Sequence, residues 1–307
     1  MGDVARSAAV SGSAAVAGGT LLRLAAFTTD PAGGNPAGVW FGDSLPPDGT
    51  MQEIATDVGY SETAFIAPDG SGHAGRLRIR YFSPLVEVPF CGHATIASGV
   101  AVTERGLAAP PAERDQPAEI VFTTNGGPVT VRTATGADGR IVATLTSVAT
   151  WVGEPDPGLT AAALAILGWR PDELDPALPP ALGFAGVRHL ILAAGSLDRL
   201  ERLNYPFDDL QALMREHDLT TLQLIWRETA DRFHARDPFP VGGVVEDPAT
   251  GAGAAALGAY LRARGEITAP ATFEIVQGVE MGRPSRLTVS IVPGEAGVRV
   301  TGNAVAI

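Results

Sequence analysis

The feature that most constrains the fold of this chain is a similarity between its two halves. When the sequence is shifted by 159 residues against itself, residues 86–106 align without a gap with residues 245–265. Eight of these 21 positions are identical, and the identities include glutamate, proline and arginine, which a chain rich in alanine and glycine would not match by composition alone. Self-similarity at a fixed spacing predicts two copies of one structural unit.

The same shift relates the elements that come before these segments. Residues 51–60 have the apolar spacing of an amphipathic helix and lead into a strand at 63–66. Residues 210–217 and 222–225 repeat this helix and strand in the second half. The same shift therefore holds for the helix and strand that precede the aligned segment in each half.

Two further helices are expected to lie at the centre of the two halves. Residues 94–105 and 254–264 carry alanine and glycine on most of their faces. A helix without a polar face is normally buried all round, and one with small side chains can be wrapped closely by a curved sheet. Alternating segments such as 77–82 and 129–132 predict the half-buried strands of that sheet.

We therefore predict an α+β fold of two pseudo-symmetric lobes, each a curved, mostly antiparallel sheet around a central helix. The turn-rich segment 153–158 is expected to link the lobes. The predicted boundaries are a flexible N-terminal tail over 1–20, an N-terminal lobe over 21–150, a C-terminal lobe over 151–294, and a last strand within 295–307 that could return to the first lobe.

Composition excludes several classes of function. All 22 cationic residues are arginine, so a lysine Schiff base, a lysine general base and a phosphate loop that ends in lysine are ruled out. The net charge of −12 argues against nucleic acid or an anionic membrane as a partner. No apolar stretch reaches the roughly 20 residues of a membrane span, and the first 20 residues lack the apolar segment of a secretion signal, so we expect a cytoplasmic protein.

The cysteine and histidine content gives no sign of a metal or a disulfide. Cys91 is the single cysteine, which excludes an internal disulfide and a cysteine-rich zinc site. The five histidines show none of the short spacings of helical metal sites. We expect neither a bound metal nor a cofactor.

Two polar turns, 91–95 and 247–253, each lead into a helix of small residues. Free backbone N–H groups and the positive end of the helix dipole point out of such a start, and glycine lets a ligand approach the backbone closely. Two such starts facing each other across the seam could bind a carboxylate or a developing oxyanion.

Each of these residues also has a purely structural interpretation. Glycines at helix starts commonly serve turn geometry, and Asp247 before a proline reads equally well as a helix cap. His93 could be a buried structural histidine. For Cys91 we favour the role of a small buried side chain.

Glu62 is the strongest candidate for a catalytic base. It lies at the junction between the first amphipathic helix and an apolar strand, where an exposed junction residue is the simpler alternative. Partial burial at the rim of a core would raise its pKa toward the range that suits proton transfer. The corresponding residue of the second half is Thr221, so the two halves share an architecture without sharing this carboxylate.

With these residues in place, the chain resembles the phenazine-biosynthesis isomerase (PhzF-like) family, which shares its fold with diaminopimelate epimerase. The resemblance runs from Leu24 to the C-terminus and rests on four motifs in order: Phe27-Thr28 with Gly34-Asn35-Pro36-Ala37, Ser61-Glu62-Thr63-Ala64-Phe65, Cys91-Gly92-His93-Ala94-Thr95, and Asp247-Pro248-Ala249-Thr250-Gly251.

The resemblance implies a homodimeric, cofactor-independent enzyme that acts on a small carboxylated substrate. It implies that Glu62 removes a proton from carbon and returns it elsewhere, while His93 and Asp247 position polar groups of the substrate. The residues implied to contact the substrate are Asn35, Gly92, Thr250, Gly251 and Ala252.

Two departures from the family pattern limit which reactions and substrates we expect. The family often has serine where this chain has Ala252, which argues against the phenazine-pathway isomerase itself and favours a relative that acts on another carboxylated metabolite. The epimerase cousins use two cysteines, and here Cys91 is matched by Thr250, which disfavours a two-thiol racemase. Our leading hypothesis is a proton-shifting isomerase; the alternatives are an epimerase with Asp247 as second base and a binding protein without turnover.

Overall fold

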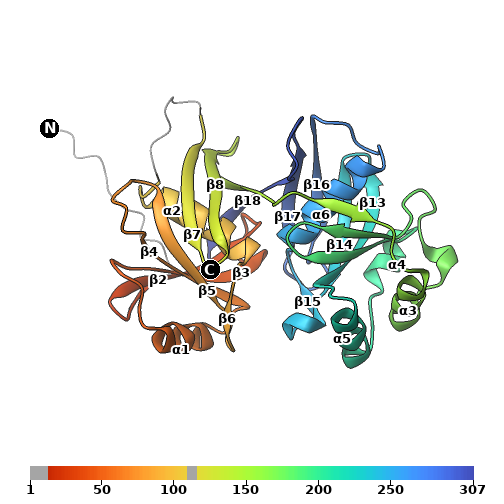
Figure 1. Ribbon diagram of the computed structural model, residues 1–307, viewed down its shortest axis with the longest axis horizontal. Helices are drawn as coiled ribbons and strands as arrows, with labels where there is room; N and C mark the ends of the chain where they lie inside the picture. Colours follow the sequence, from red (N-terminus) through yellow and green to blue (C-terminus); the bar gives the residue numbers. More distant parts are fainter. Residues whose placement is uncertain (1–12, 109–115) are drawn as a thin grey trace.

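The first lobe is an eight-stranded barrel closed by the last strand of the chain. The computed structural model describes residues 13–108 and 116–307, which form two lobes lying side by side (Figure 1). Neighbouring barrel strands pair antiparallel except for β3 with β4 and β5 with β7. In order around the barrel the strands are β2 (Gly19–Ala26), β3 (Asn35–Phe41), β4 (Glu62–Pro68), β5 (Arg76–Phe82), β7 (Ala118–Thr124), β8 (Gly127–Thr135), β9 (Ile141–Thr146) and β18 (Arg299–Ala306).

The second lobe repeats this order of pairings in an open sheet. Its parallel pairs are β12 with β13 and β14 with β16. Its strands are β10 (Trp151–Gly153), β11 (Ala181–Phe184), β12 (Arg188–Ala193), β13 (Thr221–Thr229), β14 (Arg232–Pro238), β16 (Ala271–Gln277) and β17 (Ser285–Ile291). Strand β18 pairs with β17 of this lobe and with β2 and β9 of the first, so one strand joins the two sheets.

The helices and short strands complete the two lobes. In the first lobe they are β1 (Ser13–Val16), α1 (Asp48–Val58), β6 (Glu87–Val88) and α2 (Gly92–Glu104). In the second they are α3 (Pro157–Leu167), the 3₁₀ turn Pro171–Glu173, α4 (Leu197–Glu201), α5 (Phe207–Glu216), the 3₁₀ turn Pro240–Gly242, β15 (Glu246–Asp247) and α6 (Gly251–Ala263). No helix among the described residues has the length and apolar character needed to cross a bilayer.

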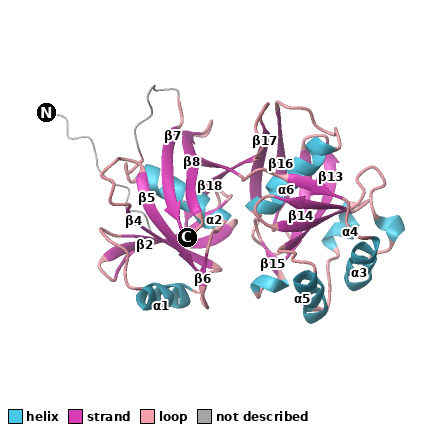
Figure 2. Cartoon of the chain, viewed as in Figure 1, coloured by secondary structure: helices cyan, strands magenta, loops and turns pink. Residues whose placement is uncertain are grey.

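Helices α2 and α6 lie among the strands of their lobes, as Figure 2 shows. Residues 93–102 of α2 are buried without interruption, and residues 253–261 of α6 likewise. A single cluster of apolar side chains fills the space between these helices and the sheets, and smaller clusters lie under α1 and between α3 and α5. The barrel with its helices agrees with the predicted α+β class.

Small residues let the sheets approach the central helices. A Cβ atom on Gly99 would lie 2.8 Å from Val131 Cγ1, and one on Gly258, the corresponding residue of α6, would lie 2.9 Å from Val298 Cγ1. Both separations are shorter than packed atoms allow. The identity of Gly99 and Gly258 in the sequence repeat therefore has a packing cause.

The N-terminal tail predicted over 1–20 is wrong from residue 13 onward. Strands β1 and β2 form a hairpin in which Ser13 pairs with Leu22, joined by Ala17 and Gly18 at φ of 48° and 77°. Two central residues with positive φ are typical of a tight hairpin turn, and a lone Ala-Gly pair is a weak sequence signal for one. Residues 1–12 lie outside the described residues.

The link predicted at 153–158 lies within the second lobe and does not join the two lobes, because β10 already pairs with β11 of that lobe. Gly153 ends β10, and Asp156 caps α3 by accepting a hydrogen bond from the Gly158 N–H at 2.7 Å. An aspartate followed by proline at the first helical position is a standard helix start. The glycine, proline and aspartate residues that suggested a turn therefore mark the beginning of α3.

The close packing around α2 leads to a stability prediction. We expect Gly99→Leu to lower the free energy of unfolding by about 1–3 kcal/mol or more, because a side chain would overpack the barrel interior. Gly49→Leu on α1 is the matched control, since a Cβ there meets nothing within 4 Å and the change should stay within about 0.5 kcal/mol. Equal urea-unfolding midpoints for the two variants would contradict this packing.

Candidate active site

Glu62, Cys91 and His93 form a compact cluster where β4 and α2 begin. Glu62 is the first residue of β4, and Cys91 and His93 flank the first residue of α2. Glu62 Oε2 lies 3.4 Å from His93 Nε2 and 3.5 Å from Cys91 Sγ. The Glu62 side chain is 16% exposed and that of His93 7%, so the carboxylate is the more accessible of the two. Its side chain therefore points to the helix start and not to bulk solvent.

Asp247 lies close enough to this cluster to feel the charges of His93 and Glu62, and it is tied to the first lobe. Its Oδ1 accepts a hydrogen bond of 2.7 Å from Asn35 Nδ2, and its Oδ2 accepts one of 2.6 Å from Thr250 Oγ1. Asn35, the first residue of β3, also donates to the Ala249 carbonyl at 3.1 Å. Residues that are far apart in the sequence thus meet at the seam between the lobes.

The electrostatic surroundings couple these groups. Burial raises the pKa of Asp247 from 3.8 to about 6, opposed by nearby His93 and increased by the Glu62 charge. Burial also raises the pKa of the Cys91 thiol well above its usual range, with the Glu62 charge as the next cause. Asp247 is therefore poised to hold or release a proton near neutral pH, whereas Cys91 is kept as a thiol.

Both helix starts present uncapped backbone N–H groups. Within the described part of the chain, no side-chain hydrogen bond caps the N-terminus of α2 or of α6, whose N-cap residues are Cys91 and Thr250. Helices α2 and α6 approach within 8 Å between Cα atoms. The free amides of the first turns, including that of Ala252, are the groups that bind anions at helix starts.

The glycines at these starts are not explained by backbone geometry or packing. Gly92 and Gly251 lack the positive φ that would require glycine. A Cβ on Gly92 would meet nothing within 4 Å, and one on Gly251 would meet only Phe27 Cζ at 3.8 Å. Turn geometry, the structural alternative considered for these glycines, is thereby weakened, and both positions have open space beside the backbone.

Phe27 forms part of the seam in an unusual conformation. Its φ of 63° lies in the left-handed region, which is rare for a bulky residue. The conformation is held by two backbone hydrogen bonds, from Phe27 N to Asn303 O at 2.7 Å and from Arg286 N to Phe27 O at 2.8 Å. Strain of this kind persists where the surroundings enforce it, and here it places the ring beside Gly251.

Sequence analysis missed a layer of buried polar residues behind Asp247. Asp237 is fully buried and pairs with Asp247 in the register of β14 and β15. The Gln223 amide nitrogen, turned toward it, lies 3.1 and 3.2 Å from its two carboxylate oxygens. Gln277 donates to the Asp247 carbonyl at 2.8 Å and to Thr250 Oγ1 at 3.1 Å. These residues hold the second turn in place.

Burial explains why the Asp237 carboxyl is protonated. Loss of solvation raises its pKa well above the usual range, and the negative charges of Asp247 and Glu246 raise it further. A buried carboxyl without a cationic partner is stable only when neutral and hydrogen-bonded. In the sequence, the one sign of this buried polar layer is the aspartate itself. Asp237 takes the position in β14 where the first lobe has the buried Tyr81.

The second lobe offers no equivalent of Glu62. Thr221, the first residue of β13, is buried and lies 2.8 Å from His189 Nδ1 through its hydroxyl oxygen. Burial lowers the pKa of His189 to about 3, so this histidine is neutral. Of these two corresponding positions, only that of the first lobe carries a carboxylate.

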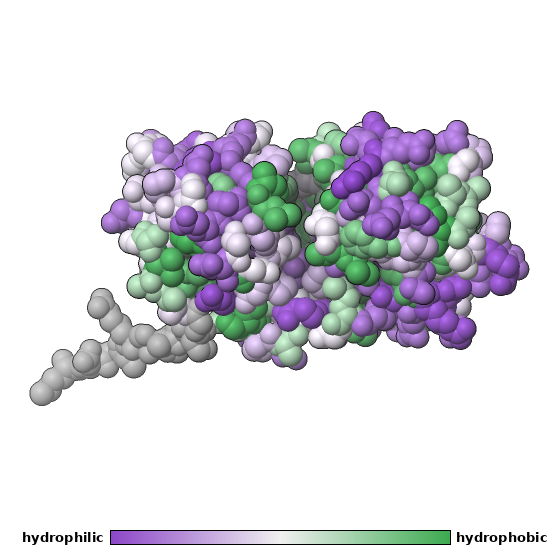
Figure 3. Space-filling view, turned by 90° about the horizontal axis from the view of Figure 1, so that it is seen from below, coloured by the Kyte–Doolittle hydropathy of each residue, from purple (hydrophilic) through white to green (hydrophobic). Residues whose placement is uncertain are grey.

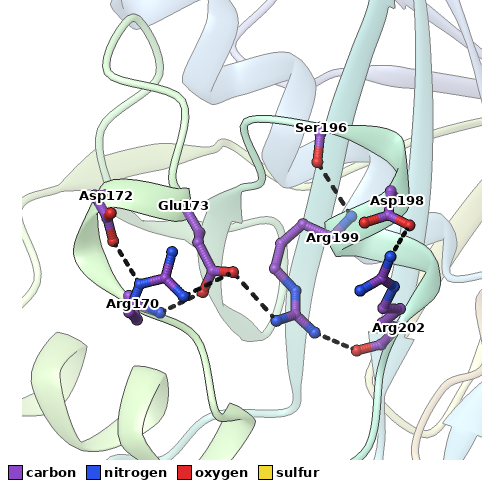
Figure 4. A network of polar contacts seen from close by, with 7 residues as sticks. All are labelled: Arg170, Asp172, Glu173, Ser196, Asp198, Arg199 and Arg202. Atoms are coloured by element: carbon purple, nitrogen blue, oxygen red, sulfur yellow. Dashed lines mark hydrogen bonds and ion pairs between the residues drawn. The ribbon is translucent and has the colours of Figure 1, made fainter.

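Another polar cluster of the second lobe has a structural role (Figure 4). Glu173 lies 3.6 Å from Arg170 and 3.5 Å from Arg199, so it joins the 3₁₀ turn after α3 to helix α4. A hollow of about 300 Å³ lies here and another of about 680 Å³ beside α3, and neither is lined by any of the predicted site residues. The charges at the first hollow are already paired with one another.

The raised pKa of Asp247 predicts a specific dependence of stability on pH. Its carboxyl is protonated in both states below about pH 4; above that, the unfolded chain loses the proton first, so stability falls up to about pH 6 by up to about 3 kcal/mol. Asp247→Asn removes this penalty, and we expect its stability relative to the wild type to rise between pH 4 and pH 7.

Urea unfolding at several pH values measures this effect. Asp57→Asn, at an exposed position on α1, is the matched control. A stability difference between wild type and Asp247→Asn that is the same at both ends of the range would show that Asp247 is not held in a desolvated site.

Comparison with known proteins agrees with this geometry. The model of the phenazine biosynthesis-like family matches residues 24–307. The trans-2,3-dihydro-3-hydroxyanthranilate isomerase of Pseudomonas fluorescens is 31% identical over 273 residues, which cover 85% of this chain and 86% of that protein. An uncharacterized isomerase of Bacillus subtilis (strain 168) is 30% identical over 292 residues, 93% of this chain and 95% of that protein.

A solved structure shows the same fold. The crystal structure of a PhzF-family phenazine biosynthesis protein from Bacillus anthracis superimposes with a TM-score of 0.80 at 27% identity, covering 94% of this chain and 96% of that chain. The resemblance proposed from the four motifs is thereby confirmed. This chain belongs to the phenazine biosynthesis-like family and is an isomerase.

Proposed function

We propose that this isomerase shifts a proton between two carbons of a small carboxylated metabolite without a cofactor, with Glu62 as the base. The observation that carries the proposal is a single accessible carboxylate held 3.4 Å from a buried histidine beside two uncapped helix starts. The seam where these groups meet lies between the lobes, and a recess between the lobes is visible in Figure 3.

The proposed chemistry follows from the position of each group. Glu62 removes a proton from a carbon next to an unsaturated or carbonyl-bearing centre, and the electron pair moves toward the carboxylate or carbonyl oxygen. The first-turn amides of α2 and α6 stabilise the charge that develops there. The protonated Glu62 then returns its proton to a different carbon, which leaves the composition of the substrate unchanged.

His93 and Asp247 are proposed to position the substrate. The imidazole lies beside Glu62, and Asp247 is fixed by Asn35 and Thr250. A partly ionised Asp247 can accept a hydrogen bond from an amino or hydroxyl substituent of the substrate. Asn35 and Thr250 are therefore proposed to act mainly through Asp247.

Epimerisation is the second candidate, and the raised pKa of Asp247 is the observation that favours it. A carboxyl that titrates near pH 6 could serve as a second base on the opposite side of the substrate from Glu62. Inversion at one carbon without migration of a double bond would distinguish this reaction from the proton shift. The homodimer that the family resemblance implies stays a prediction.

The substrate differs from that of the phenazine enzyme in this proposal. Ala252 provides the backbone amide of the second turn without the hydroxyl that family members often carry there. The substrate is then a carboxylated metabolite that needs no hydrogen bond from this position. Trans-2,3-dihydro-3-hydroxyanthranilate, the substrate in the names of the Pseudomonas relatives, remains the natural first probe.

Replacing the proposed base tests the mechanism. With a substrate found by screening small carboxylic acids from this probe outward, Glu62→Gln should lower turnover by about 10²–10⁴-fold and abolish deuterium incorporation from heavy water into the product. Glu53→Gln, at an exposed position on α1, is the control and should retain both. Unchanged deuterium incorporation in Glu62→Gln would exclude this residue as the base.

The glycine turns allow a second test that separates binding from folding. Gly92→Ala places a methyl group in open space at the helix start, so the free energy of unfolding should stay constant or rise by up to about 1 kcal/mol. Binding of the carboxylate should weaken at least tenfold, because the methyl group lies where the ligand approaches. Full affinity in Gly92→Ala would contradict ligand contact at this turn.

A further inference from the structure

Three side chains of the proposed active site are arranged as the ligands of a metal ion. Glu62, Cys91 and His93 each offer one ligand atom, and these atoms lie within 4.8 Å of one another. The three edges of the triangle are 3.4 Å from Glu62 Oε2 to His93 Nε2, 3.5 Å from Glu62 Oε2 to Cys91 Sγ, and 3.8 Å from Cys91 Sγ to His93 Nε2.

These edges match one face of a tetrahedral zinc site. Zinc binds cysteine sulfur at about 2.3 Å, histidine nitrogen at about 2.0–2.1 Å and carboxylate oxygen at about 2.0–2.2 Å. At tetrahedral angles such bonds separate the ligand atoms by about 3.3–3.6 Å. The observed triangle needs to contract by only a few tenths of an ångström along its longest edge.

We propose that this triangle binds Zn²⁺ and that the bound ion inhibits the enzyme. The ion displaces the proton of the Cys91 thiol, so that one Zn²⁺ is held by thiolate, imidazole and carboxylate and one proton is released. Three protein ligands leave a fourth position for water or a substrate oxygen. The inhibition rests on the proposed function, because the metal engages the carboxylate assigned as the base. The binding of Zn²⁺ itself does not rest on the proposed function.

The surroundings favour this ion over others. The thiolate and carboxylate together balance its charge, and Asp247 adds a negative field from the opposite side of the seam. Among the described residues, no arginine forms a hydrogen bond or ion pair with Glu62, Cys91 or His93. A sulfur and nitrogen donor set selects Zn²⁺ and Co²⁺ over Mg²⁺ and Ca²⁺, which prefer oxygen ligands.

Short metal-binding motifs do not reveal this site, because its ligands come from different elements. Glu62 begins a strand, whereas Cys91 and His93 flank a helix start, and the spacing between them matches no short metal motif. The three residues resemble a zinc site only in the distances between their ligand atoms, which the folded chain provides. Cys91, which takes no part in the proposed reaction, acquires a chemical role here.

Cobalt spectroscopy on the full-length, metal-free protein tests the proposal directly. Because the chain has one cysteine, a thiolate-to-cobalt charge-transfer band can arise only from Cys91. We expect this band together with the intense visible absorption of tetrahedral cobalt, saturating at one ion per chain and displaced by Zn²⁺. Calorimetric titration with Zn²⁺ should show the same stoichiometry.

Variants identify the ligands. Cys91→Ser should abolish the charge-transfer band and weaken Zn²⁺ binding at least about 100-fold, since even outer-shell changes cost 10–100-fold. His93→Asn provides a second ligand variant in case the first does not fold, and should weaken binding similarly. His73→Asn, at an exposed histidine that is not part of the cluster, should bind as the wild type does.

The outcomes separate this proposal from the proposed function. Absence of the charge-transfer band, or a Zn²⁺ affinity that Cys91→Ser and His93→Asn leave unchanged, would overturn the metal site whatever the activity of the enzyme. If the band appears and Glu62→Gln retains full turnover, the metal site stands and the assignment of the base fails.

Discussion

The arrangement of the site depends on the hydrogen bond from Asn35 to Asp247. It joins the first residue of β3 to the turn before α6 and so fixes the second helix start relative to the barrel. Asn35 is 1% exposed, and a buried amide that lost its partner would cost about 1–3 kcal/mol. Arg283 supports the same contact by donating to the carbonyls of Gly33 and Gly34. The lobes are thus held in one alignment at the point where the chemistry is proposed.

In each lobe, an arginine–glutamate ion pair also helps to position the start of the central helix. Arg80 binds Glu87 through two hydrogen bonds of 2.7 Å, and Arg236 binds Glu246 through bonds of 3.0 and 2.6 Å at the corresponding place. Paired, two-point contacts of this kind fix geometry as well as charge. They give the glutamate identity of the sequence repeat a structural cause: it holds the hairpin that precedes each amide-rich turn.

Periodicity and local motifs were sufficient to predict the repeated elements, the central helices and the residues at the two turns. Glu62 and His93 could be named because each lies in a short motif at the end of an element. Asp237, Gln223 and Gln277 could not, since only strand pairing in the fold brings Asp237 and Gln277 to Asp247 and Gln223 to Asp237. The same limit applies to the β1–β2 hairpin, which depends on a two-residue turn and on Trp40, whose indole N–H donates to the Val16 carbonyl at 2.8 Å.

The central claim is that the two helix starts hold the carboxylate of a substrate within reach of Glu62. A crystal structure with a bound small carboxylic acid tests it most directly. The account predicts carboxylate density within hydrogen-bonding distance of the first-turn amides of α2 and α6, with a carbon of the ligand facing Glu62. Density at another location, or a ligand at the seam turned away from Glu62, would contradict it.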